Sequence, residues 1–480
     1  MDHKYFLSDN PKVLADAIKQ VIYSDKSSDK RKKMQEGIDY YTGKHAILGY
    51  RLFFTDNDGK VVEDRTRSNI KIPHQFFTEL VDQKTQYLLS NPIEITTEQE
   101  GLQDYLDEYI DEEFQQVLQE LVEGAAQKSH EYVYVRRDDR LRFASADSMK
   151  VIEIHDDKYE RIAVVRYYET DLFVDGRNVR VTRAELWDNE RVWFFVNGGQ
   201  NNPQFMLDEQ EAINPRPHET FVKGDEVIGK GLGYIPFFRF DNNRQKQSDL
   251  VPVKRLIDDY DLMACSLSNN LQDFDQPFFA VKGFNGGDYD TLINNLRARG
   301  SVGVDKEGGL EVHTVQIPYE ARKVKLEVDK EAIYKFGMGF DSSQVGDGNI
   351  TNVVIKSRYS LLDLKCDKTE KRLRVLLKKL LKLIVEDINT RFGTSYTHEG
   401  LEITITRDTM VNERDVSEIA QIEALAQQTK VNTIIAAATY LDSDSVLRLM
   451  CEALDLSFEE VSKAVEDDEP FAVEGGANAE

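Results

Sequence analysis

The chain reads GMGFDSSQVGDGNITNVVIKSRYSLLDLKCDKTEKRLRVLLKKLLKLIVEDINTR over residues 337–391, and this stretch decides the fold. Glycine recurs through its first dozen residues, which disfavours regular structure there. These glycines are Gly337, Gly339, Gly346 and Gly348. From about Asn352 the chain can remain helical as far as Arg391, a rod of about 60 Å at 1.5 Å per residue. The stretch therefore predicts a glycine-rich loop followed by a very long helix.

The long helix is predicted to have two unlike faces. Its apolar arc consists of Leu373, Leu377, Leu380 and Ile384. Its basic arc consists of Lys371, Arg374, Lys378 and Lys382. Spacings of three and four residues place each set on one side of a helix, so one side predicts a core and the other predicts water or phosphate. Pairing of the basic arc with the nearby acids Asp363, Asp367 and Glu370 explains it equally well.

The residues before the glycine loop predict two helices with a small module between them. Ser248 and Asp249 can cap a helix over about 250–274, roughly 37 Å long at 1.5 Å per residue. Residues 276–318 follow, with strand-like segments at 278–281 and 310–315 and a short helix at about 289–299. Residues 321–336 then predict a return helix.

The flanking regions predict an α+β protein. Helical periodicity appears at 11–23, at 73–91 and over a single segment of about 102–127. Asn57-Asp58-Gly59 marks a hairpin turn, and residues 131–240 alternate in the manner of antiparallel strands. Beyond a strand at 401–406, helices are expected at 413–430, 432–441 and 443–455.

Composition limits the classes of function. The chain has 480 residues, 40% hydrophobic, with a formal net charge of −25 and a pI near 4.9. Such acidity argues against a protein whose whole surface coats nucleic acid. The charge is uneven, however, because residues 351–391 hold eleven Lys or Arg against five Asp or Glu, whereas residues 411–480 hold four against sixteen.

The three cysteines predict no disulfide framework and no zinc ribbon. Cys265, Cys366 and Cys451 are far apart and form no CxxC, which favours a reducing compartment. Residues 1–10 lack the apolar core of a signal peptide, and no run approaches the length that a bilayer requires. We therefore expect a soluble protein without a membrane partner.

No motif predicts catalysis. Residues 224–231 resemble a phosphate loop but lack the final Ser or Thr and precede no helix, so we interpret them as an ordinary loop. Residues 56–59 lack the first acidic ligand of a calcium loop, and a hairpin turn explains them better. Paired carboxylates such as Asp258-Asp259 and Glu112-Glu113 are typical of solvated helix faces. We predict no enzyme activity, no metal and no cofactor.

The order of these parts resembles the portal proteins of tailed bacteriophages, in particular those of long-tailed phages of Gram-positive hosts. The resemblance covers nearly the whole chain and lies in the order of four short segments. They are Tyr40-Tyr41 with Gly43-Lys44-His45, residues 87–95 around Asn91-Pro92, Ile235-Pro236 with Asn242-Asn243, and Asn269-Asn270-Leu271-Gln272-Asp273-Phe274.

The resemblance implies a portal fold with named parts in chain order. They are a wing (1–247, helices and then strands), a first stem helix (248–275), a small α/β clip (276–318), a second stem helix (319–338), a tunnel loop (339–352), a long wing helix with a strand (353–407) and a helical crown with an acidic tail (408–480).

The resemblance also implies site residues. The DNA-tunnel loop is expected to comprise Phe340, Asp341, Ser342, Ser343, Gln344, Val345, Gly346, Asp347, Gly348, Asn349, Ile350, Thr351 and Asn352. A clip interface is expected at Phe278, Phe279, Val281, Leu310 and Val312, although a buried local sheet explains these apolar residues equally well. Candidate DNA-facing cations are Lys323, Lys325, Lys330, Lys335, Lys356 and Arg358.

By the same resemblance, the chain forms a ring of about twelve copies at one capsid vertex, through which double-stranded DNA is packaged and ejected. Expected partners are the terminase, the scaffolding and major capsid proteins and the head-completion adaptor. The expected location is the virion, with the host cytoplasm during assembly. The alternatives are another structural virion protein, from the capsid or the tail, and a packaging enzyme.

Overall fold

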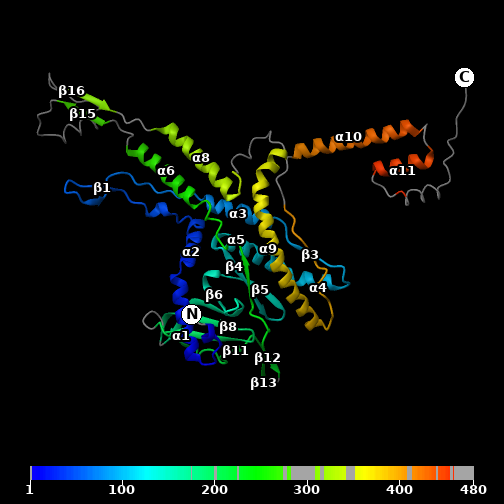
Figure 1. Ribbon diagram of the computed structural model, residues 1–480, viewed down its shortest axis with the longest axis horizontal. Coiled ribbons are helices and arrows are strands. Elements are labelled where there is room, and N and C mark those ends of the chain that lie inside the picture. Colours follow the sequence, from blue (N-terminus) through cyan, green and yellow to red (C-terminus); the bar gives the residue numbers. More distant parts are fainter. Residues whose placement is uncertain are drawn as a thin grey trace. The chain divides into compact units, whose positions relative to one another are not determined.

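The structure is a computed structural model of the whole chain. It describes residues 3–174, 176–198, 203–223, 226–273, 278–282, 309–313, 318–341, 352–407, 413–438, 442–454 and 458. Two compact units divide the chain. The first comprises Met1–Ser342 with Tyr359–Asp408, and the second comprises Ser343–Arg358 with Thr409–Glu480. The expected α+β fold is confirmed (Figure 1).

A six-stranded antiparallel sheet forms the largest β-layer of the first unit. Its strands follow the order β10-β9-β8-β7-β6, with β11 also paired to β9. They span β6 (Val151–His155), β7 (Arg161–Val174), β8 (Arg177–Trp187), β9 (Arg191–Asn197), β10 (Phe205–Leu207) and β11 (Arg216–Pro217). Since consecutive strands are neighbours, short turns suffice to connect them, as the alternating pattern predicted.

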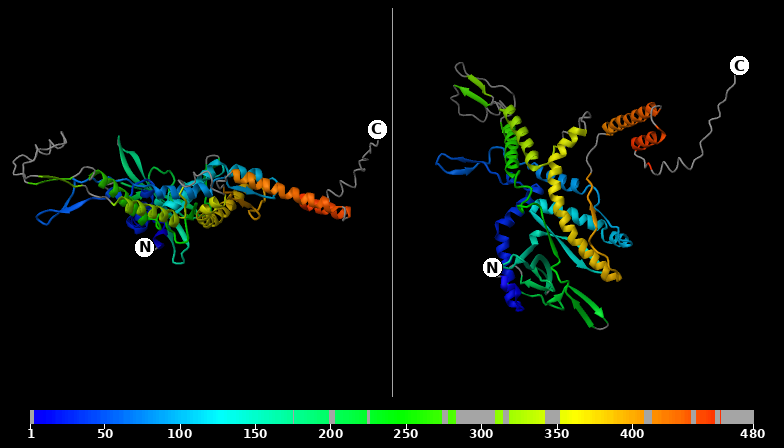
Figure 2. Two further views of the ribbon diagram at one scale, coloured as in Figure 1. Left: turned by 90° about the horizontal axis from the view of Figure 1, so that it is seen from above. Right: turned by 45° about the vertical axis from the view of Figure 1, so that its right-hand side comes forward.

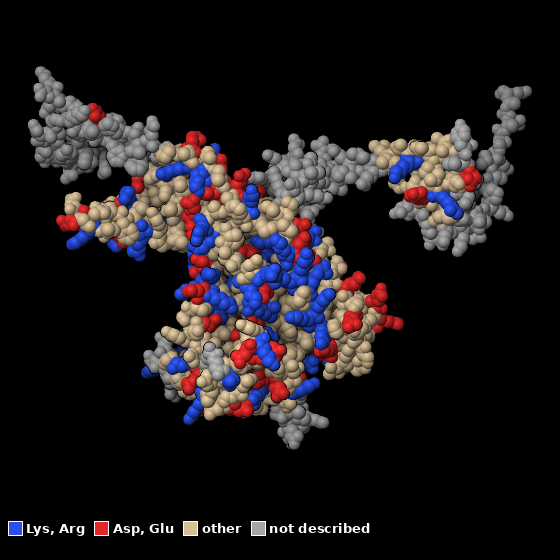
Figure 3. Space-filling view, viewed as in Figure 1, with Lys and Arg blue, Asp and Glu red and all other residues tan. Residues whose placement is uncertain are grey.

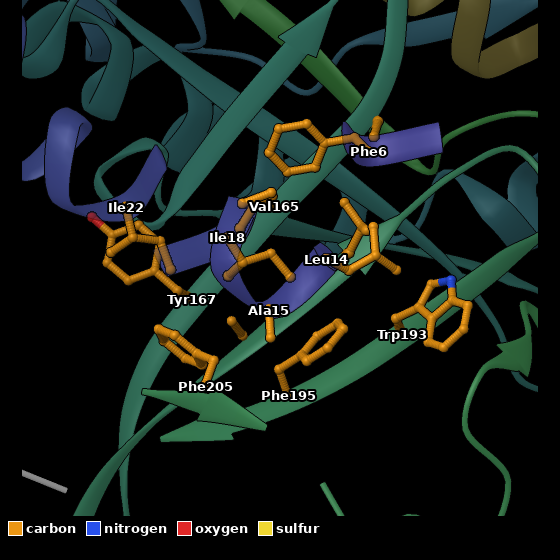
Figure 4. Close-up of a cluster of buried hydrophobic side chains, with 14 of the residues drawn as sticks. Phe6, Leu14, Ala15, Ile18, Ile22, Val165, Tyr167, Trp193, Phe195 and Phe205 are labelled. Atoms are coloured by element: carbon orange, nitrogen blue, oxygen red, sulfur yellow. The ribbon is translucent and has the colours of Figure 1, made fainter. Parts of the chain in front are cut away.

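Helix α1 (Pro11–Ser27) covers one face of this sheet (Figure 4). Asn10 caps it by accepting a hydrogen bond from Lys12 N at 3.0 Å, and Pro11 fits the first helical position. Leu14, Ile18 and Ile22 recur at intervals of four and are buried among the sheet's aromatic side chains. The 3₁₀ helix η1 (His3–Leu7) adds Phe6 to the same core.

A second sheet joins β14 (Phe237–Asp241), β4 (His130–Arg137) and β5 (Leu141–Ala146) in that order. Helix α5 (Glu112–Lys128) packs on it and also touches α2 (Asp29–Tyr41) and α3 (Phe76–Leu88). Smaller elements complete this part of the unit. They are η2 (Ala46–Gly49), η3 (Ser148–Lys150), the hairpin β1 (Phe53–Thr55) and β2 (Val61–Glu63), and the hairpin β12 (Glu219–Lys223) and β13 (Glu226–Lys230).

Helices α6 (Lys254–Asp273) and α8 (Tyr319–Gly337) lie side by side in Figures 1 and 2. Strands β15 (Phe278–Lys282) and β16 (Gly309–His313) pair antiparallel in the segment between them. The expected helix–strand–strand–helix order is thus confirmed. The short helix expected near residues 289–299 lies outside the described residues.

Helix α9 (Asn352–Phe392) is 41 residues long, as the sequence predicted. Its apolar arc is confirmed as a core face, because Leu373, Leu377, Leu380 and Ile384 are all fully buried. Past α9 the chain returns as β17 (Glu402–Thr404), which pairs with the distant β3 (Glu94–Thr96). This pairing ties the C-terminal part of the first unit to its N-terminal half.

Three predicted helix bounds were wrong. The segment expected as one helix over 102–127 is α4 (Leu102–Tyr109) followed by α5, since Asp111 caps the second helix by accepting from Phe114 N. Helix α6 begins at Lys254 rather than near Leu250, because short turns precede it and Asp249 has other partners, described below. In the second unit, α10 (Glu413–Ala437) is one helix where two were expected, and α11 (Ser443–Leu454) packs on it.

Cys265, Cys366 and Cys451 are free and buried. Burial raises the pKa of the Cys366 thiol to about 11. Within the described ranges, no helix has the length and apolarity needed to span a bilayer.

Gly37 sets how closely α2 can approach α5. A Cβ at this position would lie 2.0 Å from the backbone carbonyl oxygen of Gln127, which cannot move aside like a side chain. We expect Gly37→Ala to lower the free energy of unfolding by about 2 kcal/mol or more, measured by urea denaturation. Gly49→Ala is the control, because nothing lies within 4 Å of its added Cβ. Equal stability of the two variants would contradict this packing.

Candidate functional site

The helix pair α6–α8 is held by both apolar and ionic contacts. Ile257 and Ile333 are fully buried in one core cluster. Farther along, Lys325 Nζ of α8 lies 2.5 Å from Asp259 Oδ2 of α6 and also pairs with Asp329. Because residue numbers rise along α6 as they fall along α8, the two helices are antiparallel.

Asp261 joins α6 to the segment that precedes α3. Its carboxylate is fully buried, with Oδ2 at 2.7 Å from His45 Nδ1 and Oδ1 at 2.8 Å from His74 Nδ1. Oδ1 also accepts from His74 N at 2.9 Å. Burial alone raises the pKa of Asp261, but the hydrogen bonds from His45 and His74 outweigh it and hold the pKa below its usual value. A charged, fully satisfied carboxylate thus ties the first half of α6 to His45 and to the segment before α3.

A second buried junction, Lys84–Asp249–Lys365, connects three elements. Lys84 of α3 donates to Asp249 Oδ2 at 3.0 Å and to Asn242 Oδ1 at 2.5 Å. Lys365 of α9 lies 3.2 Å from the same Oδ2 and donates to Gly337 O at 3.0 Å. The base of α6, the C-terminus of α8 and the middle of α9 therefore meet around one carboxylate.

Burial and charge act together at this junction. Burial lowers the pKa of Lys84, and the neighbouring Lys365 lowers it further. For Asp249, burial raises the pKa, but Lys365 and Lys84 outweigh burial and hold it well below its usual range. Removing one partner would leave a buried charge poorly compensated, which is far more costly than losing a surface ion pair.

The described start of the predicted tunnel loop is anchored. Gln83 of α3 brackets Phe340, since Gln83 Nε2 donates to Phe340 O at 2.8 Å and Phe340 N donates to Gln83 Oε1 at 3.2 Å. The Phe340 ring packs on Tyr359 of α9 with 4.5 Å between ring centroids. Asp341 lies 2.7 Å from Lys330. Residues Ser342 to Thr351 lie outside the described chain, and Asn352 is the first residue of α9.

The candidate DNA-facing cations differ in their surroundings. Lys325 and Lys330 are engaged in the ion pairs given above. Lys323 and Lys335 are exposed on α8. Lys356 and Arg358 belong to the first turns of α9, where side chains are outside the description. Contact of any of them with DNA stays a prediction.

The five clip residues come together in one hairpin. Phe279 is the register partner of Val312, and Val281 is that of Leu310, while Phe278 pairs with His313. Their side chains lie outside the described part of the structure, so the predicted interface is carried forward as a proposal.

The basic arc of α9 is only partly explained by pairing within the helix. Arg374 pairs with Glu370 at 2.7 Å, and Lys382 lies 3.8 Å from Glu386. The expected role of Asp363 and Asp367 was wrong, because both pair with Arg407 instead. That arginine follows β17, which brings it over this part of α9.

The remaining motif interpretations are partly revised. Residues 226–230 form strand β13 of a hairpin rather than a loop. Residues 56–59 make the expected turn, with Asp56 Oδ1 accepting from Asp58 N and Lys60 N. In the part of the chain that is described, no cluster of His, Cys, Asp or Glu could hold a metal ion.

Sequence reasoning missed the buried ionic junctions. The sequence did carry one signal for the Lys84–Asp249–Lys365 junction. Lys84 falls at helical spacing on the apolar face of α3, among Phe77, Leu80, Val81 and Leu88. Asp249 was interpreted as a helix cap, and nothing local marks His45 or His74 as partners of a residue some 190 to 220 positions away.

Comparison with known proteins identifies the family. The family model described as "Phage portal protein, SPP1 Gp6-like" matches residues 21–453. The portal protein of Bacillus phage SPP1 is 27% identical over 388 residues, covering 79% of this chain and 75% of that protein. The portal protein of Clostridium phage phiCD119 is 25% identical over 429 residues, covering 84% and 88%.

A solved structure, the neck of an empty GTA particle computed with C6 symmetry, contains a similar chain with a TM-score of 0.39 and 12% identity. The match covers 78% of this chain and 90% of that chain.

The fold and the paired helices define a structural component of a phage head, and the chain belongs to the phage portal protein family. It is thus a portal for DNA packaging, a ring-forming part of the virion's head–tail connector and not an enzyme. The resemblance seen in the sequence is confirmed, and neither alternative gains support.

Replacing one cation of the buried junction should destabilise the first unit. We expect Lys84→Met to lower the free energy of unfolding by about 3 kcal/mol, the low end for a broken buried pair, since Lys365 still faces Asp249. Lys378→Met is the matched control on an exposed face and should change stability by no more than about 0.5 kcal/mol. Urea denaturation of both variants measures the difference.

Asp261 should contribute acid-sensitive stability. Its pKa is lowered by folding, so its contribution is fully present above the unfolded value of 3.8 and is lost as the pH falls through the lower folded value. We expect Asp261→Asn to cost about 2 kcal/mol near neutral pH, by leaving the histidines poorly paired. The difference from the unsubstituted chain should shrink below pH 3.8, and a constant difference across pH would contradict this assignment.

Proposed function

We propose that about twelve copies form the ring, with α6 and α8 as its stem and the DNA channel on its axis. The observation that carries this proposal is the antiparallel helix pair, rigidly joined at its base and interrupted by a small hairpin. Such a pair can line a channel without local unfolding, because the buried Asp261 and Asp249 carboxylates hold α6 and the residues just before it.

Exposed apolar side chains on the stem support packing against further copies. They are Leu262 and Leu271 on α6, and Val324, Val328 and Phe336 on α8. Val324 and Val328 are 55% and 54% exposed and stand one turn apart. A closed ring uses heterologous contacts, in which two different faces of each subunit meet. Apolar rows on both stem helices fit that requirement.

Residues 339–352 are proposed as the tunnel loop that contacts DNA. They contain Asp341 and Asp347 but no Lys or Arg, so they would touch DNA without gripping its phosphates. The candidate cations of the stem and of the first turns of α9 would supply limited attraction elsewhere. Lys323 and Lys335 are the best placed on exposure.

The remaining parts are proposed to dock partners. Residues 276–318 would form the clip, which meets the terminase during packaging and the head-completion adaptor afterwards. Residues 1–247 and 353–407 would form the wing, and 408–480 the crown. Assembly would take place in the host cytoplasm, with the scaffolding and major capsid proteins, before the ring occupies one capsid vertex.

Shortening the loop tests this assignment. Replacing residues 341–352 by a short Gly-Ser linker should leave ring formation unchanged, as measured by native mass spectrometry, because both stem helices remain intact. Virions assembled with it should package or retain less DNA. A linker of equal length is the control for loop length.

Two outcomes would contradict the proposal separately. Normal DNA content with the short linker would remove the loop's role in handling DNA. Monomers or open filaments of the unsubstituted protein would remove the ring with about twelve subunits.

A further inference from the structure

A cationic groove runs beside the middle of α9. It encloses about 670 Å³ between α9 and the segment from Arg239 to Gln245. Five of its cations come from Arg244, Lys368, Lys371, Arg372 and Lys379. Figure 3 shows Lys and Arg gathered over the part of this face where Figure 1 draws α9. The gathering is unexpected on a chain whose net charge is −25.

These five cations have no charged partner among the residues that the structure describes. None has an ion pair or a side-chain hydrogen bond to another described residue, whereas the neighbouring Arg239 and Arg374 are both paired. Lys368 and Lys379 are eleven residues apart, so the row extends for roughly 17 Å along the helix. Mutual repulsion of so many like charges is unfavourable and would be relieved by an anionic partner.

The groove is not purely ionic. Val375 lies among the cations and is 58% exposed, while its neighbour Leu376 is buried. An exposed aliphatic side chain between lysines suits a partner that presents apolar atoms beside its carboxylates.

The same chain carries a complementary surface on α4 and the residues before it. Exposed carboxylates stand at Glu98, Glu100, Asp104 and Asp107. Glu98, Glu100 and Asp104 form no ion pair among the described residues, and Asp107 accepts from Gln103 Nε2 at 2.8 Å. Asp104 and Asp107 stand one helical turn apart and project with Leu102 and Leu106 buried behind them.

One subunit cannot use both surfaces on itself. Helix α4 packs near the end of α9, where the Tyr105 ring contacts the Phe392 ring and Arg391 donates a hydrogen bond to Tyr109. Arg372 is nineteen residues before Arg391, which puts the groove roughly 28 Å farther back along the helix. Two complementary faces that cannot meet within a subunit are what a head-to-tail ring requires.

We propose that the cationic groove receives the acidic α4 segment of the next copy of this chain in the ring. The inference rests on the proposed ring and names the faces that meet. The carboxylates of α4 would lie along the row from Lys368 to Lys379, with Val375 covered at its centre. Such contacts steer subunits into one register and weaken as salt rises.

Charge reversal tests the pairing. Lys371→Glu with Lys379→Glu should raise the protein concentration needed for half-assembly into rings at least tenfold, as measured by native mass spectrometry at fixed salt. Asp104→Lys with Asp107→Lys should do the same. The four substitutions together should restore rings to within about threefold of the original chain. Lys12→Glu with Lys158→Glu is the control, because both lysines are exposed and lie outside the groove.

Cross-linking gives a second measurement that does not depend on assembly strength. Lys371→Cys with Asp104→Cys, treated with a short bismaleimide, should give a ladder of covalent multimers, and either substitution alone should not. The native cysteines are buried and should react little.

Three outcomes would overturn the proposal. Rings unaffected by groove reversal but with reduced DNA content would assign the groove to DNA. If charge reversal changed neither ring formation nor DNA content, the groove would be an ordinary solvated surface. Unsubstituted protein without rings would instead remove the proposed ring, and the contact with it.

Discussion

The Asp249 carboxylate is the constraint on which the rest of the first unit depends. It is held by Lys84 from α3 and Lys365 from α9, while Asn242 completes its hydrogen bonding. Lys365 also donates a hydrogen bond to the carbonyl oxygen of Gly337, at the end of α8. Ionic groups placed this deeply are stable only when every member is present. The junction therefore makes the positions of α3, α6, α8 and α9 interdependent.

This interdependence fixes the shape of the helix pair. The helix pair is held by the carboxylates of Asp261, within α6, and Asp249, just before it, and by the apolar packing of Ile257 and Ile333. Close backbone approach adds to the stiffness, because a Cβ at Gly337 would lie 2.5 Å from Leu80. Rigid elements of this kind leave changes in shape to the segments that connect them.

Sequence periodicity predicted most of this architecture, because α1, α3 and α9 bury regular apolar faces and Gly59 marks its turn unambiguously. Two of the wrong expectations were decided by single polar contacts between distant residues. Asp249 is a good local cap, yet it binds two lysines more than a hundred residues away on either side. The spacing of Asp363 would allow an ion pair within its own helix, yet Asp363 pairs with Arg407 instead. Spacing in the sequence cannot show which of the possible ion pairs forms, because this depends on which side chains the tertiary structure brings together.

The aromatic side chains of Phe340 and Tyr359 are in contact, although eighteen residues, 341–358, separate them in the sequence. This contact fixes the two ends of the segment against each other, and Gln83 also holds Phe340. Lengthening a flexible segment between fixed ends costs about 0.6 kcal/mol of closure entropy for each doubling, so it need not displace α3 or α9. Insertions and deletions can therefore accumulate in this segment while the packed elements on either side of it stay the same.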